Sequence, residues 1–248
     1  MSEVGVQFLG SGDAFGSGGR FQTCIYVQSG PTRFLIDCGA SSLIAMRRFG
    51  VDPSLIDIIL LTHLHGDHFG GLPFFILDAQ LISKRTRPLL VAGPPGLEAR
   101  LPEAMEALFP DSSRVPQKFP LQLVELAAEK ETTIAPLVVT AYCVVHPSGA
   151  PAYALRVACG GKVVACSGDT EWTDALTRAA RGADLFICEA YFFEKRIKYH
   201  LDYQALLSHR EELGCRRLVL THMNEDLLRR LEQVDLECAE DGKRIVLT

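Results

Sequence analysis

Three of the seven histidines in this 248-residue chain fall within six residues, in a segment rich in metal-ligating side chains. The segment reads Thr62-His63-Leu64-His65-Gly66-Asp67-His68. It follows the apolar run Ile58–Leu61, so we expect a loop at a strand end, with the first two histidines on one side. The glycine permits a turn that brings the aspartate and the third histidine beside them. A solvated polar loop is the alternative, but this density of zinc-type ligands predicts a metal site.

Further ligand-type residues follow apolar strand patterns later in the chain. His146 closes the pattern Val138–Val145, Asp169 comes shortly after Lys162–Ala165, and His222 follows a run that ends at Thr221. Each residue taken alone is more typical of a structural polar group than of a ligand. Because α/β proteins place their sites at strand ends, we expect these residues to converge with the histidine segment at one site where the strands end.

These motifs together resemble the metallo-β-lactamase-fold hydrolases. The contexts Ser167-Gly168-Asp169-Thr170 and Leu220-Thr221-His222 are similar to those of the ribonuclease Z and phosphodiesterase branch. So are two segments near the start, Phe8-Leu9-Gly10-Ser11-Gly12-Asp13-Ala14-Phe15 and Leu35-Ile36-Asp37-Cys38-Gly39. The resemblance covers nearly the whole chain and is more specific for the fold than for the substrate.

The resemblance implies an α/β (α+β) four-layer αββα sandwich with the site between the sheet edges. It also implies two divalent metal ions, zinc or manganese. The implied ligands of the first ion are His63, His65 and His146. Those of the second are Asp67, His68 and His222, with Asp169 bridging both. Asp67 is further expected to act in catalysis, and Asp37 to support the metal loop structurally.

His200 is the further histidine to which the resemblance assigns a role. In the phosphodiesterase branch a histidine in this region helps to stabilise or protonate the reacting phosphate. A protonated imidazole beside a developing oxyanion or a leaving alkoxide favours such a reaction. Leu201 departs from the small polar residue usual in the ribonucleases, and a solvated histidine beside a helix is the alternative. His209 has no motif around it, and we assign it no function.

The interval between His146 and Asp169 is short and contains a Gly-Gly hairpin turn. The long basic, glycine-rich arm that tRNA-processing members carry there is missing from this interval. We therefore expect a small anionic phosphodiester, such as a cyclic nucleotide or a cyclic sugar phosphate, or a short nucleic-acid end. A solvated face is the usual fate of a basic cluster, but we expect Lys195, Arg196 and Lys198 to attract such a substrate.

The predicted function is a dinuclear phosphodiesterase in which a metal-bound hydroxide attacks phosphorus and His200 assists the leaving group. A lactone or thioester hydrolase on the same scaffold is one alternative. A tRNA 3'-processing endonuclease without the usual arm is another. A metal-dependent sensor without turnover is a third, which the bridging carboxylate disfavours, because a structural zinc needs only four closed ligands.

Short elements separated by Gly, Pro and Ser clusters must position these residues. Strands are expected at Val4–Leu9, Cys24–Gln28, Arg33–Asp37, Ile56–Leu61, Leu89–Gly93, Leu121–Leu126, Leu137–His146, Ala152–Cys159, Lys162–Ser167, Leu185–Glu189, Arg217–Thr221 and Arg244–Leu247. Helices are expected at Ser41–Phe49, Gly70–Ser83, Gly96–Phe109, Glu171–Arg181, Tyr203–Leu213 and Glu225–Glu232. This order indicates two sheets with helices outside, in one domain over residues 1–248.

The composition, with 48% hydrophobic and 22% charged residues, is that of a globular protein. A net charge of -5 disfavours a sequence-independent nucleic-acid coat. No apolar run approaches the roughly 18 residues that span a bilayer, and no signal peptide is evident, so we expect a cytoplasmic protein.

The eight cysteines lack a C-x-x-C pair and are expected to be reduced and buried. The stretch Phe69–Leu77 is expected to form core and the interface of a homodimer. The cluster Lys84-Arg85-x-Arg87 is expected to be solvated.

Overall fold

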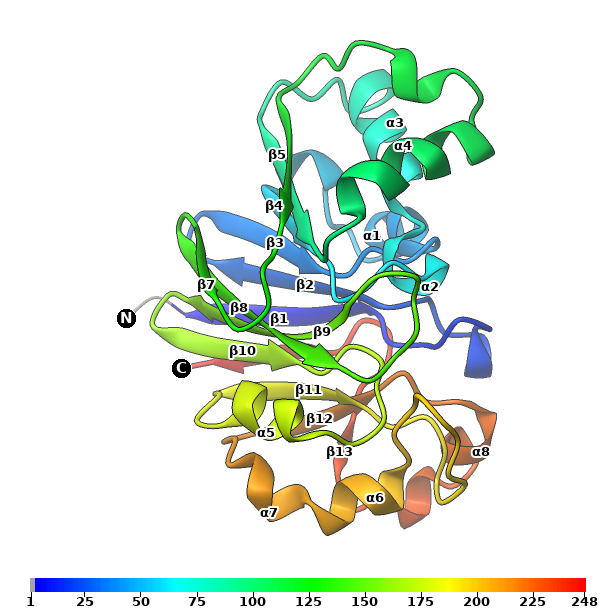
Figure 1. The fold of residues 1–248 in the computed structure, drawn as a ribbon, viewed down its shortest axis with the longest axis vertical. Coiled ribbons are helices and arrows are strands. Elements are labelled where there is room, and N and C mark those ends of the chain that lie inside the picture. The colour runs from blue at the N-terminus through cyan, green and yellow to red at the C-terminus, as the bar shows by residue number, and fades with distance from the viewer. Residues whose placement is uncertain (1–2) are drawn as a thin grey trace.

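Two seven-stranded sheets lie face to face in the computed structural model, which describes residues 3–248 (Figure 1). In spatial order the first sheet consists of β14 (Arg244–Leu247), β1 (Val4–Gly10), β2 (Cys24–Ser29), β3 (Thr32–Ile36), β4 (Ile58–Leu60), β5 (Leu89–Gly93) and β6 (Leu121–Glu125). The second consists of β13 (Glu237–Cys238), β12 (Leu218–Thr221), β11 (Leu185–Glu189), β10 (Lys162–Cys166), β9 (Ala152–Cys159), β8 (Leu137–Val144) and β7 (Glu131–Ile134).

Strand alternation fills the layer between the sheets with apolar side chains. Along β1, Val4, Val6 and Phe8 point into this layer, where they belong to one buried cluster with Leu155 and Val157 of β9. Residues on the opposite faces of the same strands, such as Leu9, pack instead against the outer helices. Both faces of the central strands are therefore buried, which explains their continuous apolar runs.

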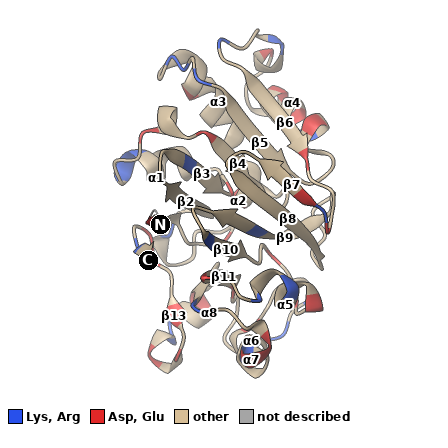
Figure 2. Cartoon of the chain, turned by 90° about the vertical axis from the view of Figure 1, so that its left-hand side faces the viewer, with Lys and Arg blue, Asp and Glu red and all other residues tan. Residues whose placement is uncertain are grey.

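Helices cover the outer faces of both sheets and complete the predicted αββα sandwich (Figure 1). Over the first sheet lie α1 (Ser42–Arg48), α3 (Leu72–Leu81) and α4 (Leu97–Leu108), with α2 (Gly66–Phe69) forming a single turn. Over the second lie α5 (Asp174–Ala180), α6 (Tyr203–Ser208), α7 (Arg210–Leu213) and α8 (Glu225–Leu228). Figure 2 shows that charged residues gather on helices and loops, while the strands are mostly uncharged.

Every predicted strand is present, with ends that shift by up to two residues. Three predicted helices are shorter than expected or broken. The helix expected from residue 171 begins only at Asp174, since the hydroxyl of Thr173 caps it by accepting the Ala175 N–H. The stretch 203–213 breaks at His209 into α6 and α7, and α8 ends at Leu228, followed by a 3-10 turn. Strands β7 and β13 were not expected, because one is polar and the other has two residues.

Two expectations about individual side chains are wrong. Arg85 is not solvated but buried, because its guanidinium donates hydrogen bonds to the carbonyl oxygens of Ser54, Ile56, Arg87 and Pro88. All eight cysteines are free thiols, as expected, but Cys143 is exposed on β8. Among residues 3–248, no helix has the length and apolarity needed to cross a membrane.

Parallel pairing in the second half of each sheet brings the ligand-type residues to one edge. Strands β3 to β6 are parallel, as are β10 to β13. Asp37 directly follows β3, the histidine segment 62–68 follows β4, and Asp169 follows β10. Glu189 ends β11 and His222 follows β12. The carboxyl ends of parallel strands meet at the same edge, so the chain gathers these residues from distant parts of the sequence.

Candidate metal centre

His63, His65 and His146 form one group of facing imidazoles. Nδ1 of His65 lies 3.0 Å from Nε2 of His146, which is 81 positions away in the sequence. The ring centroid of His63 lies 5.0 Å from that of His65 and 4.9 Å from that of His146. One nitrogen of each residue lies within 4.8 Å of the other two. The three residues implied for the first ion are therefore brought together.

Asp67, His68, Asp169 and His222 form a second group with the same spacing of ligand atoms. Nε2 of His68 lies 3.2 Å from Oδ1 of Asp169 and 3.3 Å from Oδ2 of Asp67. Oδ2 of Asp169 lies 3.5 Å from Nε2 of His222 and 3.8 Å from Nε2 of both His63 and His146. The Asp169 carboxylate thus faces both groups, as a bridging ligand must.

Buried atoms in this cluster lack the partners that burial normally demands. Nε2 of His63, Nε2 of His68 and Oδ1 of Asp169 have no hydrogen-bond partner within residues 3–248. A polar atom left unpaired in the interior costs about 1–3 kcal/mol, so three in one place require an explanation. Imidazole nitrogens and carboxylate oxygens are a suitable donor set for divalent cations. The cluster therefore has the composition and the unpaired atoms of a divalent-metal site.

Asp37 holds the histidine loop in position from behind. Its Oδ1 accepts the N–H of Thr62 at 2.8 Å, and its Oδ2 lies 2.7 Å from Nδ1 of His68. The hydroxyl of Thr62 is in turn 3.0 Å from Nδ1 of His63. Because Nδ1 of His63 and Nδ1 of His68 are hydrogen-bonded in this way, each ring presents its Nε2 to the cluster. The carboxylate thus takes the structural position that the resemblance implied for it.

Gly168 allows the β10 loop to approach the β4 loop closely enough to deliver Asp169. Its φ is +59°, and a Cβ there would lie 2.7 Å from the carbonyl oxygen of Tyr153 and 3.0 Å from Cβ of Thr62. Any other residue would be strained and would push the two loops apart. On the other side of the cluster, Nδ1 of His146 lies 2.9 Å from the Tyr199 carbonyl oxygen, which orients this ring.

The crowding of imidazoles and carboxylates shifts the pKa values of the cluster in opposite directions. Burial, with the charge of His68, holds the pKa of His63 well below its ordinary value. Burial also opposes the charged form of His222, but the carboxylates of Asp169, Asp67 and Glu189 together outweigh it and raise the pKa of His222 to about 9. Burial alone would raise the pKa of Asp169, yet His222 and His68 hold it well below its usual range. The Asp169 carboxylate is therefore kept negative where a cation would be bound.

His200 lies beside this cluster and pairs with a carboxylate that the sequence analysis missed. Its Nδ1 is 3.0 Å from Oε2 of Glu189, which is buried and whose Oε1 accepts the N–H of Thr170. Its ring centroid lies 5.0 Å from that of His146 and 5.8 Å from that of His222. Burial lowers and the Glu189 hydrogen bond raises the pKa of His200, and the net direction is upward.

Glu189 and Tyr191 are the functional candidates that were not predicted. Tyr191 packs on His200, with ring centroids 4.7 Å apart. Glu189 ends an apolar strand at the same sheet edge as the other site residues, and this position is the sequence signal that could have identified it. Tyr191 has no such signal in the sequence, because only the fold brings its ring onto His200.

The three residues of the basic cluster have different surroundings. Arg196 lines a hollow next to His200. Lys195 instead places its ammonium 5.0 Å from the ring centroid of Phe192, and Lys198 is exposed.

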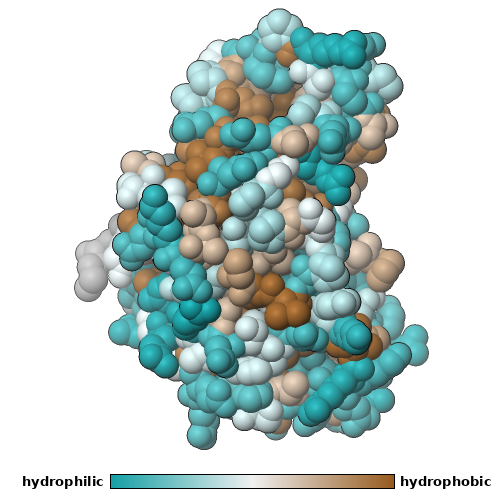
Figure 3. Space-filling model, viewed as in Figure 1, coloured by the Kyte–Doolittle hydropathy of each residue, from teal (hydrophilic) through white to brown (hydrophobic). Residues whose placement is uncertain are grey.

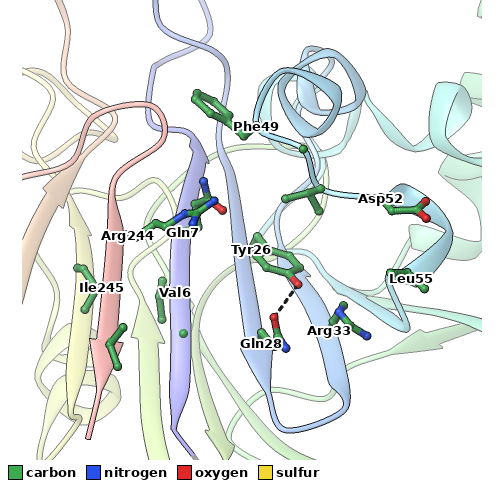
Figure 4. Close-up of a pocket in the computed structure, with 14 residues that line it drawn as sticks. Val6, Gln7, Tyr26, Gln28, Arg33, Phe49, Asp52, Leu55, Arg244 and Ile245 are labelled. Atoms are coloured by element: carbon green, nitrogen blue, oxygen red, sulfur yellow. Dashed lines mark hydrogen bonds between the residues drawn. The ribbon is translucent and has the colours of Figure 1, made fainter.

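A separate hollow of about 350 Å³ lies on the outer face of β14, β1 and β2, between Tyr26, Arg33 and Arg244 (Figure 4). Its lining residues come from other elements than those that carry the histidine cluster.

The fold and the cluster define a metallo-β-lactamase-fold, ribonuclease Z-like protein and a metal-dependent hydrolase. The family described as Anti-Pycsar protein Apyc1 matches residues 4–240, and the chain belongs to it. A ribonuclease Z of Lachnoclostridium phytofermentans is 27% identical over 90% of this chain and 88% of its own length. The short form of human tRNase Z is 25% identical, with a TM-score of 0.77 over 97% of this chain and 98% of that one. The metallo-β-lactamase-fold protein YhfI of Bacillus subtilis has a TM-score of 0.81, at 20% identity and full coverage of both chains.

Proposed function

We propose that this protein is a dinuclear phosphodiesterase that hydrolyses a small phosphodiester, with a cyclic nucleotide as the first substrate to test. The observation that carries the proposal is the His200–Glu189 pair beside the carboxylate of Asp169. Hydrolysis of a thioester expels a thiolate, which leaves without protonation and gains little from a general acid, whereas a lactone expels an alkoxide and is separated from a phosphodiester by assay. A phosphodiester with an alcohol leaving group gains from such an acid.

The proposed ligand set follows the two groups of facing atoms. One cation is held by His63, His65 and His146, the other by Asp67, His68 and His222, with Asp169 shared. Zinc is the proposed metal and manganese the alternative, since both accept imidazole and carboxylate. When bound, a pair of divalent cations activates water and neutralises charge on phosphoryl oxygens.

The chain's own residues have separate tasks in this proposal. Asp67, whose Oδ2 lies 3.2 Å from Nε2 of His222, orients the attacking water by accepting its hydrogen bond. Glu189 binds Nδ1 of His200, so Nε2 of that ring is the nitrogen left to donate a proton to the leaving oxygen. Tyr191 packs on the same ring and restricts its rotation.

The substrate's size is inferred from what surrounds the cluster. Between His146 and Asp169 the chain forms only the β9–β10 hairpin, which turns at Gly160 and Gly161. A long RNA therefore has no extended arm to bind in this interval. Processing of RNA 3' ends is the second candidate, and the likeness to ribonuclease Z over 90% of the chain favours it.

A substrate panel tests the proposal. The zinc- or manganese-loaded protein is given a 3',5'-cyclic nucleotide, a precursor tRNA and an aryl lactone at equal concentrations. We expect hydrolysis of the cyclic nucleotide to be fastest. Cleavage of the tRNA alone would favour the ribonuclease, and turnover of the lactone alone would reject phosphodiester chemistry.

We further propose that two copies associate through the outer side of α3 and α4. Leu81, Ile82 and Leu108 expose 62%, 68% and 49% of their surface there, and Phe74 on α3 is partly exposed. Figure 3 shows further apolar side chains gathered in the upper part of the molecule, around β5. Leu81→Glu and Ile82→Glu together should convert a dimer to a monomer in light scattering. A wild-type monomer would contradict this proposal.

A further inference from the structure

The helices over the first sheet leave part of β14, β1 and β2 open, and the hollow of about 350 Å³ lies there (Figure 4). Val246 of β14 is 50% exposed on this face. Helix α1 ends at Arg48, and the segment 49–55 that follows it forms one wall of the hollow, opposite the strands. The volume falls in the range of about 300–1,000 Å³ that small-molecule sites occupy.

Gly5 keeps the floor of this hollow open. It lies inside β1, which pairs with β14 on one side and with β2 on the other, and a glycine inside a paired strand weakens a sheet. A Cβ at Gly5 would meet no atom within 4 Å, and the φ of this residue lies outside the left-handed region. Neither packing within residues 3–248 nor backbone conformation therefore requires a glycine here. Such a glycine often marks the close approach of a ligand.

Two aromatic rings, those of Tyr26 and Phe49, line the hollow beside this floor. Phe49 is held in place by Phe21, with ring centroids 6.5 Å apart and planes at 89°. The hydroxyl of Tyr26 donates to Oε1 of Gln28 at 3.3 Å. Leu55 adds apolar surface to the wall. Bare strand backbone and aromatic rings favour a ligand with a flat, apolar body.

Arg33 and Arg244 bring positive charge to the hollow from opposite sides of Tyr26 (Figure 4). The ion pairs that arginines form within residues 3–248 involve neither of them. Both charges act at the same point, because burial raises the pKa of the Tyr26 hydroxyl while Arg33 and Arg244 oppose that rise, and the net direction is upward. A planar guanidinium binds a carboxylate through two parallel hydrogen bonds.

Asp52 is the acidic residue in the lining, and its carboxylate already has a partner. Its Oδ1 accepts the N–H of Ser54 at 2.8 Å and so caps the 3-10 turn η2 (Pro53–Leu55). Two guanidiniums beside one such carboxylate leave the hollow with a net positive charge. An acid is therefore favoured as its ligand over an amine.

We propose that this hollow binds a small aromatic carboxylic acid. The flat body of the ligand lies over Gly5, between the strands and Phe49, and its carboxylate lies beside the Tyr26 hydroxyl, where Arg33 and Arg244 attract it. The lining residues come from other elements than those of the metal centre, so the inference is independent of the proposed phosphodiesterase function.

Binding of 2-naphthoate to the metal-loaded protein tests the proposal. Its dissociation constant is measured by saturation-transfer NMR, beside 2-naphthylmethanol, which lacks the charge, and acetate, which lacks the rings. We expect saturable binding of 2-naphthoate and an affinity at least about tenfold lower for each of the other two, because each lacks one of the two kinds of contact. Equal affinities for the acid and the alcohol would overturn the proposal.

Variants locate the bound ligand. Gly5→Val should abolish binding, because its side chain would enter the hollow, while stability in urea stays equal or rises, since valine is favoured in strands. Arg33→Gln and Arg244→Gln should each weaken binding by about tenfold. Arg114→Gln is the matched control, because this exposed arginine lies outside the lining of the hollow.

The metal centre is the competing site, because a carboxylate is also a ligand for divalent cations. Binding there would persist in Gly5→Val, since no residue that lines the hollow belongs to the metal cluster. Unchanged affinity for 2-naphthoate in Gly5→Val, or in both arginine variants, would overturn the proposal. The arginine variants keep the test decisive if Gly5→Val folds poorly.

Discussion

Replacing His200 by alanine tests whether this ring donates a proton to the leaving group. A positioned general acid contributes about 10²–10⁴-fold to a rate, which corresponds to about 3–5.5 kcal/mol of activation free energy. The loss should depend on the leaving group, because an alkoxide needs the proton and a nitrophenolate leaves without it. We expect His200→Ala to lower kcat by about 10²–10⁴-fold on a cyclic nucleotide. On bis(p-nitrophenyl) phosphate the loss should be about tenfold or less.

Glu189→Gln should produce a smaller loss of the same kind. The amide keeps the shape of the buried side chain but removes the charge that lies 3.0 Å from Nδ1 of His200. A hydrogen bond to a charged group contributes about 1.5–3 kcal/mol, so kcat on a cyclic nucleotide should fall by about 10- to 100-fold. Glu232→Gln, an exposed substitution of the same type, is the matched control and should leave kcat unchanged.

The assay compares both substrates for each variant and measures the bound metal by elemental analysis. Because His200 also faces His146 and Asp169, a role as a metal ligand is the competing explanation. Equal losses on the two substrates, together with lower metal content, would refute the general-acid role and assign the ring to metal binding. A selective loss on the alkoxide-leaving substrate at full metal content is the expected result.

Three further predictions concern metal affinity and stability. Asp37→Asn should weaken metal binding about 10- to 100-fold, measured by competition with a chelator, because the group that orients His68 is weakened. Arg85→Ala should lower the free energy of unfolding by about 3 kcal/mol in urea titrations, since buried carbonyl oxygens lose their donor, and equal stability would contradict this. Arg217, together with Lys243, lowers the pKa of Glu237 from 4.5 to about 2. Glu237→Gln should therefore cost at most about 1 kcal/mol near neutral pH, for a partly exposed pair. That difference should vanish as the pH falls from 4.5 toward 2, and a constant difference would refute the linkage.

The histidine cluster was predictable because one of its segments carries a strong local signal. The segment around His63 is dense in ligands, whereas Asp169 and His222 are weak signals alone, and their place at strand ends together with the family resemblance assigned them to the same site. The sandwich itself followed from the resemblance and from the order of strand and helix patterns. The edge strands β7 and β13 were not predicted, because short or polar segments acquire strand geometry only by pairing with a neighbouring strand.

Other parts of the site depend on contacts between distant positions. Glu189 stands at a strand end like the other site residues, but its pairing with His200 depends on the fold. Arg85 looked like part of a solvated cluster, and only the fold shows the carbonyl oxygens that bury it. Local periodicity does not report such long-range partners.

The central claim is that the Asp169 cluster is a metal centre that hydrolyses phosphodiesters. The most direct test measures hydrolysis of bis(p-nitrophenyl) phosphate by protein stripped of metal and then reloaded with zinc or manganese, beside Asp169→Asn treated in the same way. We predict activity only after reloading, with two ions per chain in the wild type, fewer in the variant and a loss of activity to match. Activity in stripped protein, or full activity and full metal content in Asp169→Asn, would contradict the account.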